Sequence, residues 1–544
     1  MRERLSFTLT LNVGGVEHTI PGGNVRGFSL HMESYGVSGS VEFVLQDDKT
    51  WGGKYEDKLL ADFQKPDLGT VTISVMPGHL ETKTEASDAK ITTTGIILEK
   101  WVSEETTIRV IDEQAVVFRR YRVTFEDFAL ALWKQHFRVA LYTKKSFKDV
   151  VEDQKGDKIS LTYDWDVITT VVPLVFFHQD PASRSSFYDL VMWYCRERLG
   201  VFTYDHAAGT YKITKVKDSS GTAKELMFED LASMASYFPP VPRHKPRVLN
   251  SYTESPRTEV CDNANAATGI FRDALMRTPI AADVDARVTL EKARPLLPLR
   301  EVTLTFRRFP TIAMSPGSLV NISDKGGFST EIITSTEAFR VFSIDLSGKA
   351  LDEGPEKTYG DTATSFEVDV SAKLEQKSDT ALRLPAIVEP RFPGHLEGKV
   401  LSEIEDAAKI TYEFKTDADT SVDTYRIVIP LFDSQEIAAP YEPESGAGNY
   451  YLPLYKNQRV VVAFDFSKAW VVRLVDWRAE ARVPLDGQGQ HMFFGKSATS
   501  NTSVLHDYQS EKPVMRMLRT NDKDTILLKL EEGKMTLKVE EQKG

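Results

Sequence analysis

The sequence predicts a mainly β protein with some α, and three observations lead to this class. Short segments in which apolar and polar residues alternate recur from residue 5 to about 120. They return around residues 300–345, and five more crowd into residues 394–483. The last segment, residues 484–544, breaks into further short alternating strands. A stretch rich in polar residues between 351 and 385 separates the first part of the chain from the rest. It indicates a domain boundary there.

The first part begins with strand-like segments divided by Gly, Pro and Asn turns. These segments are SFTLTLNV, GSVEFVLQD, GTVTISVMP, AKITTTGIILEKWV and QAVVFRRYRVTF. Helical periodicity follows at residues 126–142 and 186–199. The sequence therefore predicts a β-rich head with helices placed between its strands.

The second helical segment has one apolar face, which is typical of a helix packed into a core. The residues of this face are Phe187, Leu190, Val191, Tyr194 and Leu199. Gly200 is expected to end the helix before the strand that starts at Val201. We predict a core role for this helix, and no functional role for Trp193 or Cys195.

Composition and charge exclude several classes of function. A net charge of −12 argues against broad capture of nucleic acid or of an anionic membrane. Two cysteines, Cys195 and Cys261, cannot build a disulfide framework or a cysteine-based zinc site. The ten histidines are scattered singly, so no metal site and no cofactor are predicted.

Targeting signals are not apparent in the sequence. The start, MRERLSFTLTLNV, alternates like a strand and lacks the apolar core of a signal peptide. No stretch has the length needed to span a bilayer as a helix. We therefore expect the chain to be made in the cytoplasm, and to leave the cell, if it does, without a cleaved leader.

A search for catalytic motifs favours no enzymatic function. The patterns HExxH, GxSxG and GxxxxGK[ST] do not occur in the sequence. With 79 acidic residues, accidental carboxylate pairs are expected, and solvated surface charge explains them best. The sequence therefore predicts that the protein is not an enzyme.

Residues 394–483 predict a small Greek-key barrel, of which the OB-fold is the commonest kind. Its five expected strands are GHLEGKVLSEI, KITYEFKT, TYRIVIPLF, QRVVVAFDF and WVVRLVDWR. A tight turn at 456–458 leads into one apolar strand, and a turn at 467–468 leads into the next. The residues of this motif are Pro453, Leu454, Tyr455, Val460, Val462, Phe464, Asp476 and Trp477.

The last twenty residues predict a strand, a turn at Gly533 and a second strand. Six apolar residues share one face of this hairpin: Ile526, Leu528, Leu530, Met535, Leu537 and Val539. A two-stranded ribbon is at best marginally stable alone. Either the hairpin packs on the chain's own barrel, or further copies of the chain cover its apolar face.

The order of these segments resembles one known family. A β-rich head precedes the helix FYDLVMWYCRERLGVFTYD, then a linker, then PGHLEGKV and PLYKNQRVVVAFDF…DW, and finally a short alternating tail. This order is similar to that of the VgrG-type hub–spike proteins of contractile injection systems, which fuse a phage-like baseplate hub to a spike. The resemblance extends over essentially the whole chain.

The resemblance implies a domain plan. Residues 1–385 are then the hub, with two tail-tube-like barrels at about 5–120 and 260–345 and helical braces between them. Residues 386–393 form a linker, 394–483 an OB-fold collar, and 484–544 a trimeric β-prism needle. Within the needle, the six apolar residues of the hairpin are expected to meet at a threefold core.

The resemblance also implies partners. They are two further copies of the chain, the inner tube protein, baseplate proteins, a PAAR-type tip protein at the C-terminal end, effector cargo and the target-cell envelope. The chain leaves no room after Asp486 for the lysozyme-sized domain that some phage spikes carry. A phage-type cell-wall hydrolase spike and an OB-fold protein that binds nucleic acid or glycan stay open as alternatives.

Overall fold

The computed structural model describes most of the chain and divides it into two compact units. It describes residues 1–544 apart from 50–52, 81–88, 109–114, 183, 295–298, 313, 323–332, 334–337, 352–358, 405, 407–410, 442–452, 476–489, 498, 511 and 542–544. The head unit comprises Met1–Val139, Ser146–Val171 and His178–Arg391, and the tail unit comprises Ala140–Lys145, Val172–Phe177 and Phe392–Gly544.

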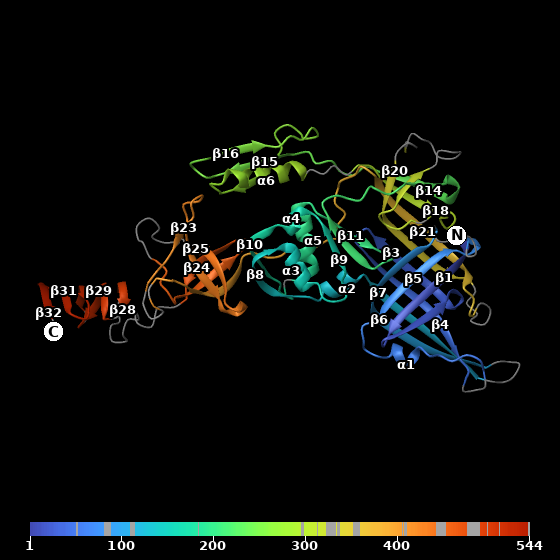
Figure 1. The fold of residues 1–544 in the computed structure, drawn as a ribbon, viewed down its shortest axis with the longest axis horizontal. Coiled ribbons are helices and arrows are strands. Elements are labelled where there is room, and N and C mark those ends of the chain that lie inside the picture. The colour runs from blue at the N-terminus through green and yellow to red at the C-terminus, as the bar shows by residue number, and fades with distance from the viewer. Residues whose placement is uncertain are drawn as a thin grey trace. The chain divides into compact units, whose positions relative to one another are not determined.

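One large, mostly antiparallel sheet builds the head unit (Figure 1). Its strands are β1 (Arg2–Val13), β2 (Val16–Pro21), β3 (Val25–Glu33), β4 (Gly36–Asp47), β5 (Thr70–Pro77), β6 (Ile91–Ile108), β7 (Ala115–Glu126), β13 (Lys224–Leu226), β14 (Leu231–Tyr237), β18 (Glu301–Phe306), β19 (Leu319–Ile322), β20 (Ala338–Ala350) and β21 (Ala363–Gln376). The five β segments predicted within residues 5–120 are confirmed as β1, β4, β5, β6 and β7.

Eight of these strands close a barrel. The hydrogen-bonded ladders run from β3 through β4, β7, β6, β5 and β1 to β21, and β20 joins β21 back to β3. Apolar side chains point into it because each strand alternates. Where β1, β3 and β21 come together, the rings of Phe7, Phe28 and Phe366 have centroids 5.0–6.4 Å apart.

The strands β20 and β21 also carry a second group of strands. The start of β20 pairs with β19, which pairs with β13, and the end of β21 pairs with β18, which pairs with β14. The ladder between β20 and β21 is therefore a wall common to both groups. Residues 1–126 and residues after 300 are joined in one hydrogen-bonded sheet, although the chain separates them widely.

A small α/β unit stands between β14 and β18 in the chain. It consists of β15 (Lys245–Asn250), β16 (Arg257–Val260), β17 (Phe271–Met276) and α6 (Ala281–Ala293). Its own core contains Val248, Cys261, Val284 and Val288. We expected residues 260–345 to supply most of a second barrel. In the structure, β17 and α6 of this segment belong to the small unit, and β18–β20 belong to the large sheet.

Short helices and a second small sheet complete the head unit. The α-helices are α1 (Leu60–Phe63), α2 (Phe128–Trp133), α3 (Phe147–Gln154), α4 (Asp166–Thr169) and α5 (Phe187–Arg198). The 3-10 helices are η1 (Gly22–Asn24), η3 (Gly78–Leu80) and η5 (Phe228–Asp230), and the small sheet comprises β9 (Leu161–Asp164), β11 (Val201–Asp205) and β12 (Thr210–Thr214). Ser146 and Ser186 cap α3 and α5, each with an Asp three residues later in a capping box.

The helix predicted over 186–199 is confirmed as α5, whereas the prediction over 126–142 is wrong in its second half. The helix α2 ends at Trp133, and β8 (Val139–Ser146) follows it. This strand pairs with β10 (Val171–His178). Pairing with a strand thirty residues further along the chain overrides the local helical pattern.

The described strands of the collar form a closed barrel within the tail unit and end at Leu474. Its strands are β22 (Gly394–Val400), β23 (Lys415–Thr416), β24 (Asp423–Ile429), β25 (Gln435–Pro440), β26 (Arg459–Phe464) and β27 (Ala469–Leu474), with η6 (Pro430–Phe432) between β24 and β25. The ladders run β25–β24–β22–β26–β27, and a bridge between Tyr441 and Val471 closes the ring. Such a five-stranded closed barrel is typical of an OB-fold.

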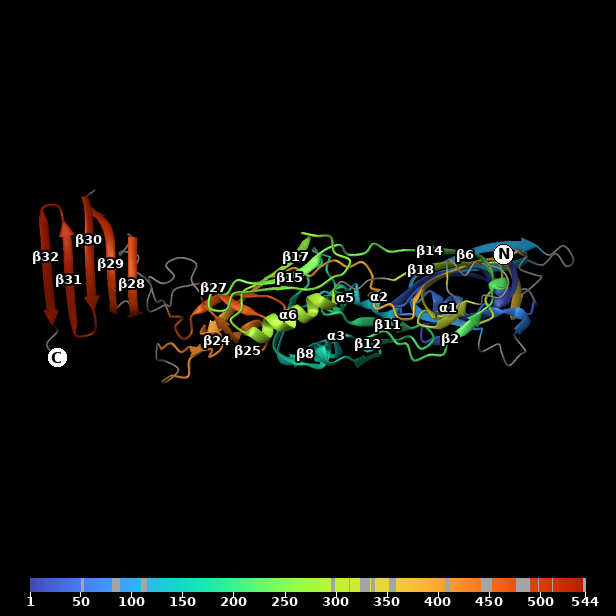
Figure 2. The same cartoon turned by 90° about the horizontal axis from the view of Figure 1, so that it is seen from above.

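The chain's last five strands form a sheet of their own, which we name the spike sheet (Figure 2). They are β28 (Gln490–Ser497), β29 (Ser500–Gln509), β30 (Lys512–Thr520), β31 (Asp524–Glu531) and β32 (Lys534–Glu541). Each strand pairs with the next in an antiparallel meander. Gly533 takes a positive φ of 67° in the last turn, a conformation that glycine adopts without strain.

In the described part of the chain, no helix is both long enough and apolar enough to cross a membrane.

Candidate assembly surface

The six apolar residues predicted to form a shared core lie on one face of the spike sheet. In the ladder between β31 and β32, Ile526 lies opposite Val539, Leu528 opposite Leu537, and Leu530 opposite Met535. Residues directly opposite each other point to the same side of a sheet. The pairing therefore brings all six together, as alternation in the sequence predicts.

This face is exposed in the single chain. Met535, Leu537 and Val539 are 70%, 69% and 67% exposed, and Ile526 and Leu530 are 37% and 40% exposed. Leu528 is half-buried between its neighbours. A contiguous group of exposed apolar side chains of this size is unusual on a folded protein, so the face is a candidate contact surface.

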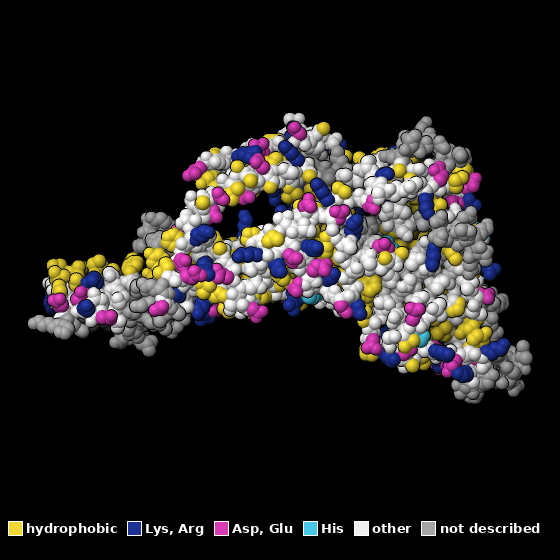
Figure 3. Space-filling model, in the orientation of Figure 1, with side chains coloured by type: hydrophobic (Ala, Val, Ile, Leu, Met, Phe, Trp, Pro, Cys, Tyr) yellow, Lys and Arg dark blue, Asp and Glu magenta, His cyan; other side chains and the backbone are white. Residues whose placement is uncertain are grey.

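The apolar face continues across the other three strands. Reading the registers from β28 to β32 gives one unbroken apolar row: Met492, Val504, Met517, Leu528 and Leu537. Phe494 and Met515 flank this row and are about as exposed as Met492. Figure 3 shows hydrophobic side chains gathered along one side of the spike sheet. The surface is larger than the hairpin alone suggests.

A few polar side chains interrupt the face beside that row. The register places Thr502, His506 and Arg519 on the same side as Met517. Arg519 reaches Asp524 with an Nη1–Oδ1 distance of 2.8 Å. The centre of the face is thus apolar, whereas its margins contain groups that water or a partner can satisfy.

The opposite face of the spike sheet is mixed. Lys529 forms an ion pair of 2.6 Å with Glu531, and Lys534 lies 3.4 Å from the same carboxylate. These two ammonium groups lower the pKa of Glu531. Leu505 and Val514 lie buried on this side. Charge is therefore concentrated on one side of the sheet and exposed apolar area on the other.

The predicted OB-fold residues are core residues of the collar where they are described. Leu454, Val460, Val462 and Phe464 are fully buried. Pro453 and Tyr455 are half-buried. Asp476 and Trp477 lie outside the described residues. The strand β25 was not predicted from sequence, and of the expected strand 409–416 only the two residues of β23 are described as a strand.

Four of the five residues predicted for the apolar face of the hub helix are buried on α5: Phe187, Leu190, Val191 and Tyr194 are each at most 6% exposed. Leu199, which follows the last residue of α5, is half-buried. Leu199 rather than Gly200 takes the left-handed conformation that ends the helix, with φ of 64°. A Cβ on Gly200 would lie 2.4 Å from the Trp165 ring, so Gly200 is required for close packing.

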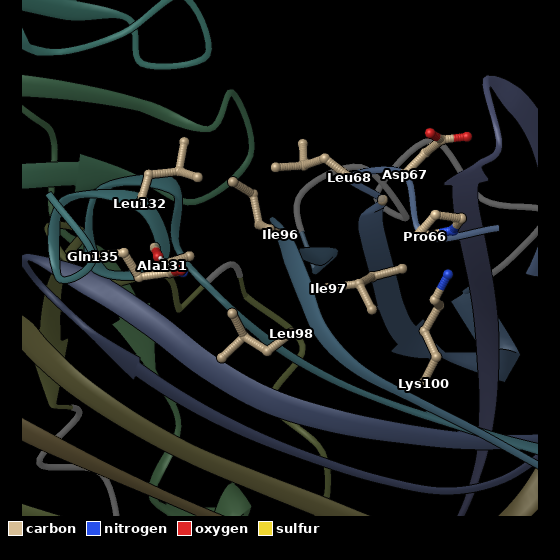
Figure 4. Close-up of a pocket in the computed structure, with 11 residues that line it drawn as sticks. Pro66, Asp67, Leu68, Ile96, Ile97, Leu98, Lys100, Ala131, Leu132 and Gln135 are labelled. Carbon is tan, nitrogen blue, oxygen red and sulfur yellow. Dashed lines mark hydrogen bonds between the residues drawn. The ribbon is translucent and has the colours of Figure 1, made fainter. Parts of the chain in front are cut away.

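A pocket in the head unit is lined mostly by apolar side chains (Figure 4). Leu68 and Leu98 at this pocket are 47% and 44% exposed. Asp67 is the single carboxylate among the lining residues, and Lys100 donates to the carbonyl of Lys65. Across the described residues, no three or more His, Cys, Asp or Glu side chains group as metal ligands would. We assign no chemistry to this pocket.

Comparison with known proteins gives matches among solved structures only. No family model matches the sequence, and no curated protein matches it. A chain of a structure described as the lidless PdpA–VgrG complex aligns with a TM-score of 0.69 and 14% identity, over 99% of each chain. A chain of the lidded Francisella PdpA–VgrG complex aligns with a TM-score of 0.70 and 14% identity, over 99% of this chain and 80% of that one. The chain therefore shares the fold of a chain in the PdpA–VgrG complexes, which agrees with the VgrG-type resemblance of its sequence.

Proposed function

We propose that this chain is the hub and spike subunit of a contractile injection system, and that it works as a homotrimer. The system is of the type VI secretion or extracellular phage-tail-like kind. In this proposal residues 1–385 form the hub, 386–393 the linker, 394–483 the collar and 484–544 the needle. The exposed apolar face of the spike sheet is the observation that carries the proposal.

Three copies would remove this face from water. A single flat sheet can cover only one of its sides with its own chain, whereas three sheets around a threefold axis cover each other. Closed rotational symmetry uses one surface repeatedly and leaves no free copy of it. Each Å² of apolar area removed from water contributes about 25 cal/mol, which favours association through this face.

The proposed role is mechanical, and no reaction is assigned to the chain. Contraction of a sheath would push the inner tube, the hub and the needle through a target envelope. Interstrand hydrogen bonds perpendicular to the strands would give the needle its stiffness. The hub would adapt the inner tube and baseplate proteins to the needle, and effector cargo would travel with it.

The distal strand β32 is a further part of the proposal. Its outer edge has unpaired backbone groups, which proteins usually cover. We place a PAAR-type tip protein on the platform that residues 535–544 of three chains would form. Deletion of 533–544 should then abolish capture of the tip protein, and intact capture would contradict this placement.

The oligomeric state tests the central claim. Light scattering on the purified chain should give three times the chain mass of 61.2 kDa. Leu537→Glu should give the mass of one chain, because a charge on the apolar face cannot be buried without a partner. Thr536→Glu adds the same charge one residue away on the other face and should leave the trimer intact. A monomeric wild-type chain with an ordered spike sheet would overturn the proposal.

A further inference from the structure

Two strands from the middle of the head's sequence belong to the tail unit. The central residues of β8 and β10, Ala140–Lys145 and Val172–Phe177, group with the collar and not with the head. The two strands pair with each other. We name this pair the clasp. It lies more than 200 residues before the collar in the chain, and no local pattern in its sequence predicts that it groups with the collar.

The clasp contacts the end of the collar strand β26. The backbone N–H of Phe176 donates to the carbonyl oxygen of Phe466 at 2.9 Å. The rings of Phe176 and Phe464 stack with centroids 4.6 Å apart and planes 30° apart. Both side chains are fully buried. Phe464 is a predicted core residue of the collar, so the clasp completes the collar's own core.

A second contact reaches the strand β25. The Thr143 hydroxyl donates to Oε1 of Gln435 at 3.4 Å. On the far side of Phe176 within the clasp, Tyr142 stacks on Phe177. Leu174, Val175 and Phe177 are buried, so this second half of β10 is covered on both of its faces. This burial explains why the segment LVFF carries no alternation.

The base of the clasp is held by the head unit. The N–H of Gln179 donates to the carbonyl of Arg138 at 2.8 Å, and the N–H of Phe187, the first residue of α5, donates to the carbonyl of His136 at 2.9 Å. Ser146, where β8 ends, caps α3. Each end of the clasp therefore continues directly into hydrogen-bonded structure of the head.

The chain consequently passes between the two units more often than a simple linker requires. It crosses at residues 139–140, 145–146, 171–172, 177–178 and 391–392. Four of these crossings belong to the clasp, and one belongs to the linker. To separate the collar from the head, the clasp strands would have to leave the core that Phe176 shares with Phe464.

We propose that the clasp is the attachment through which the head and the collar are held together, and that the collar depends on it for its stability. In the proposed function, the firing force then reaches the spike through the clasp as well as through the linker. That mechanical consequence rests on the proposed function, whereas the attachment itself does not depend on how many chains assemble.

Cleavage of the linker separates the two routes. A protease site inserted between Pro390 and Arg391 allows the full chain to be cut after it has folded. The two fragments should still elute together, because the clasp stays in the collar. When the Phe176→Ala variant is cleaved, its two fragments should separate at a lower urea concentration than the fragments of the cleaved wild-type protein. Separation of the wild-type fragments without denaturant would overturn the proposal.

Hydrogen exchange on the uncut chain supplies the second measurement. Phe176→Ala should speed exchange in Arg459–Phe464 by about a hundredfold, because it opens a cavity against β26. Phe202→Ala, a matched loss of a buried ring in the head, should leave that segment unchanged. Phe176→Leu should restore most of the protection.

Unchanged exchange of Arg459–Phe464 in Phe176→Ala would also overturn the proposal. Light scattering on the same samples reports the oligomeric state separately. A trimer in which Phe176→Ala leaves the collar unchanged would contradict the clasp proposal but agree with the proposed function. A monomer in which Phe176→Ala destabilises the collar would contradict the proposed function but agree with the clasp proposal.

Discussion

Arg340 on β20 lies directly opposite Glu375 on β21, and the two form an ion pair of 2.9 Å that is almost completely buried. Lys217 donates to the same carboxylate at 2.7 Å, and Arg383 donates to it at 2.9 Å. Three cations thus share one carboxylate in the wall common to the two strand groups of the head. This network joins segments that are far apart in sequence.

Glu375→Gln should destabilise the head unit strongly. The amide would leave three largely buried cations without their shared anion, a loss of about 3–5 kcal/mol. Thermal unfolding followed by circular dichroism should show the head transition at a lower temperature. Glu367→Gln, at an exposed position of the same strand, should change stability by less than about 0.5 kcal/mol. Equal shifts for the two variants would contradict the role of the network.

Two buried groups in the head should respond to pH in opposite directions. Burial lowers the pKa of His206 to about 4, and its Nε2 lies 2.9 Å from the carbonyl of Glu33. Burial raises the pKa of Asp127 to about 6, although Tyr211 donates to it at 2.6 Å. As pH falls from 6.5 to 4, only the unfolded state protonates His206, so stability decreases. As pH falls from 6 to 3.8, only the folded state protonates Asp127, so stability increases.

These opposite contributions should nearly cancel in the wild-type chain between pH 6 and pH 4. Relative to wild type, His206→Gln should gain roughly 2 kcal/mol over this range, and Asp127→Asn should lose roughly 2 kcal/mol. The measurement is the head's unfolding midpoint as a function of pH, taken as the difference from wild type. Parallel pH profiles for the three proteins would show that neither group titrates as described.

The alternation in the sequence was sufficient to predict the strands and the apolar face of the spike sheet. The face on which Leu537 and Val539 lie is predictable because apolar and polar residues alternate in β32 and a short turn fixes its register. Long-range pairing was beyond such reasoning. Nothing local in β1 or β3 indicates that they pair with β21 and β20, more than 300 residues away.

Other elements were missed because their local signal points elsewhere. Residues 134–142 continue a helical pattern. The strand β8 forms there nevertheless, because it pairs with β10. The strand β25, QEIAAP, is short, contains two alanines and ends in proline, which is a weak strand signal. The strand β10 was not predicted at all, because nothing local in the run LVFF indicates that it packs against the collar.

The end of helix α5 gives a test of two neighbouring residues. Leu199→Gly should leave stability unchanged or raise it slightly, because glycine adopts the left-handed conformation without the cost of about 1 kcal/mol that leucine bears. Gly200→Ala should destabilise the head by several kcal/mol, because the new methyl group would overlap Trp165. Thermal unfolding of both variants is the measurement. The opposite order would contradict both the strain at Leu199 and the close packing of Gly200 against Trp165.

Asp189 anchors the linker to the hub helix. Its carboxylate accepts from Lys134 Nζ at 2.7 Å, from the N–H of Ser186 at 2.9 Å and from the N–H of Val388 at 3.1 Å. Burial alone would favour the neutral acid, but these donors outweigh it and lower the pKa of Asp189. One side chain thus joins α5, the end of α2 and the linker.

Asp189→Asn should loosen the linker while the chain stays folded. An amide cannot accept from all of these donors, and its NH₂ group would face one of them. The Val388 amide should therefore exchange at least tenfold faster, which corresponds to about 1.4 kcal/mol. Glu389→Gln removes an exposed ion pair of 2.7 Å with Arg196 in the same segment and should change exchange little. If both variants left Val388 equally protected, contacts other than Asp189 would hold the linker.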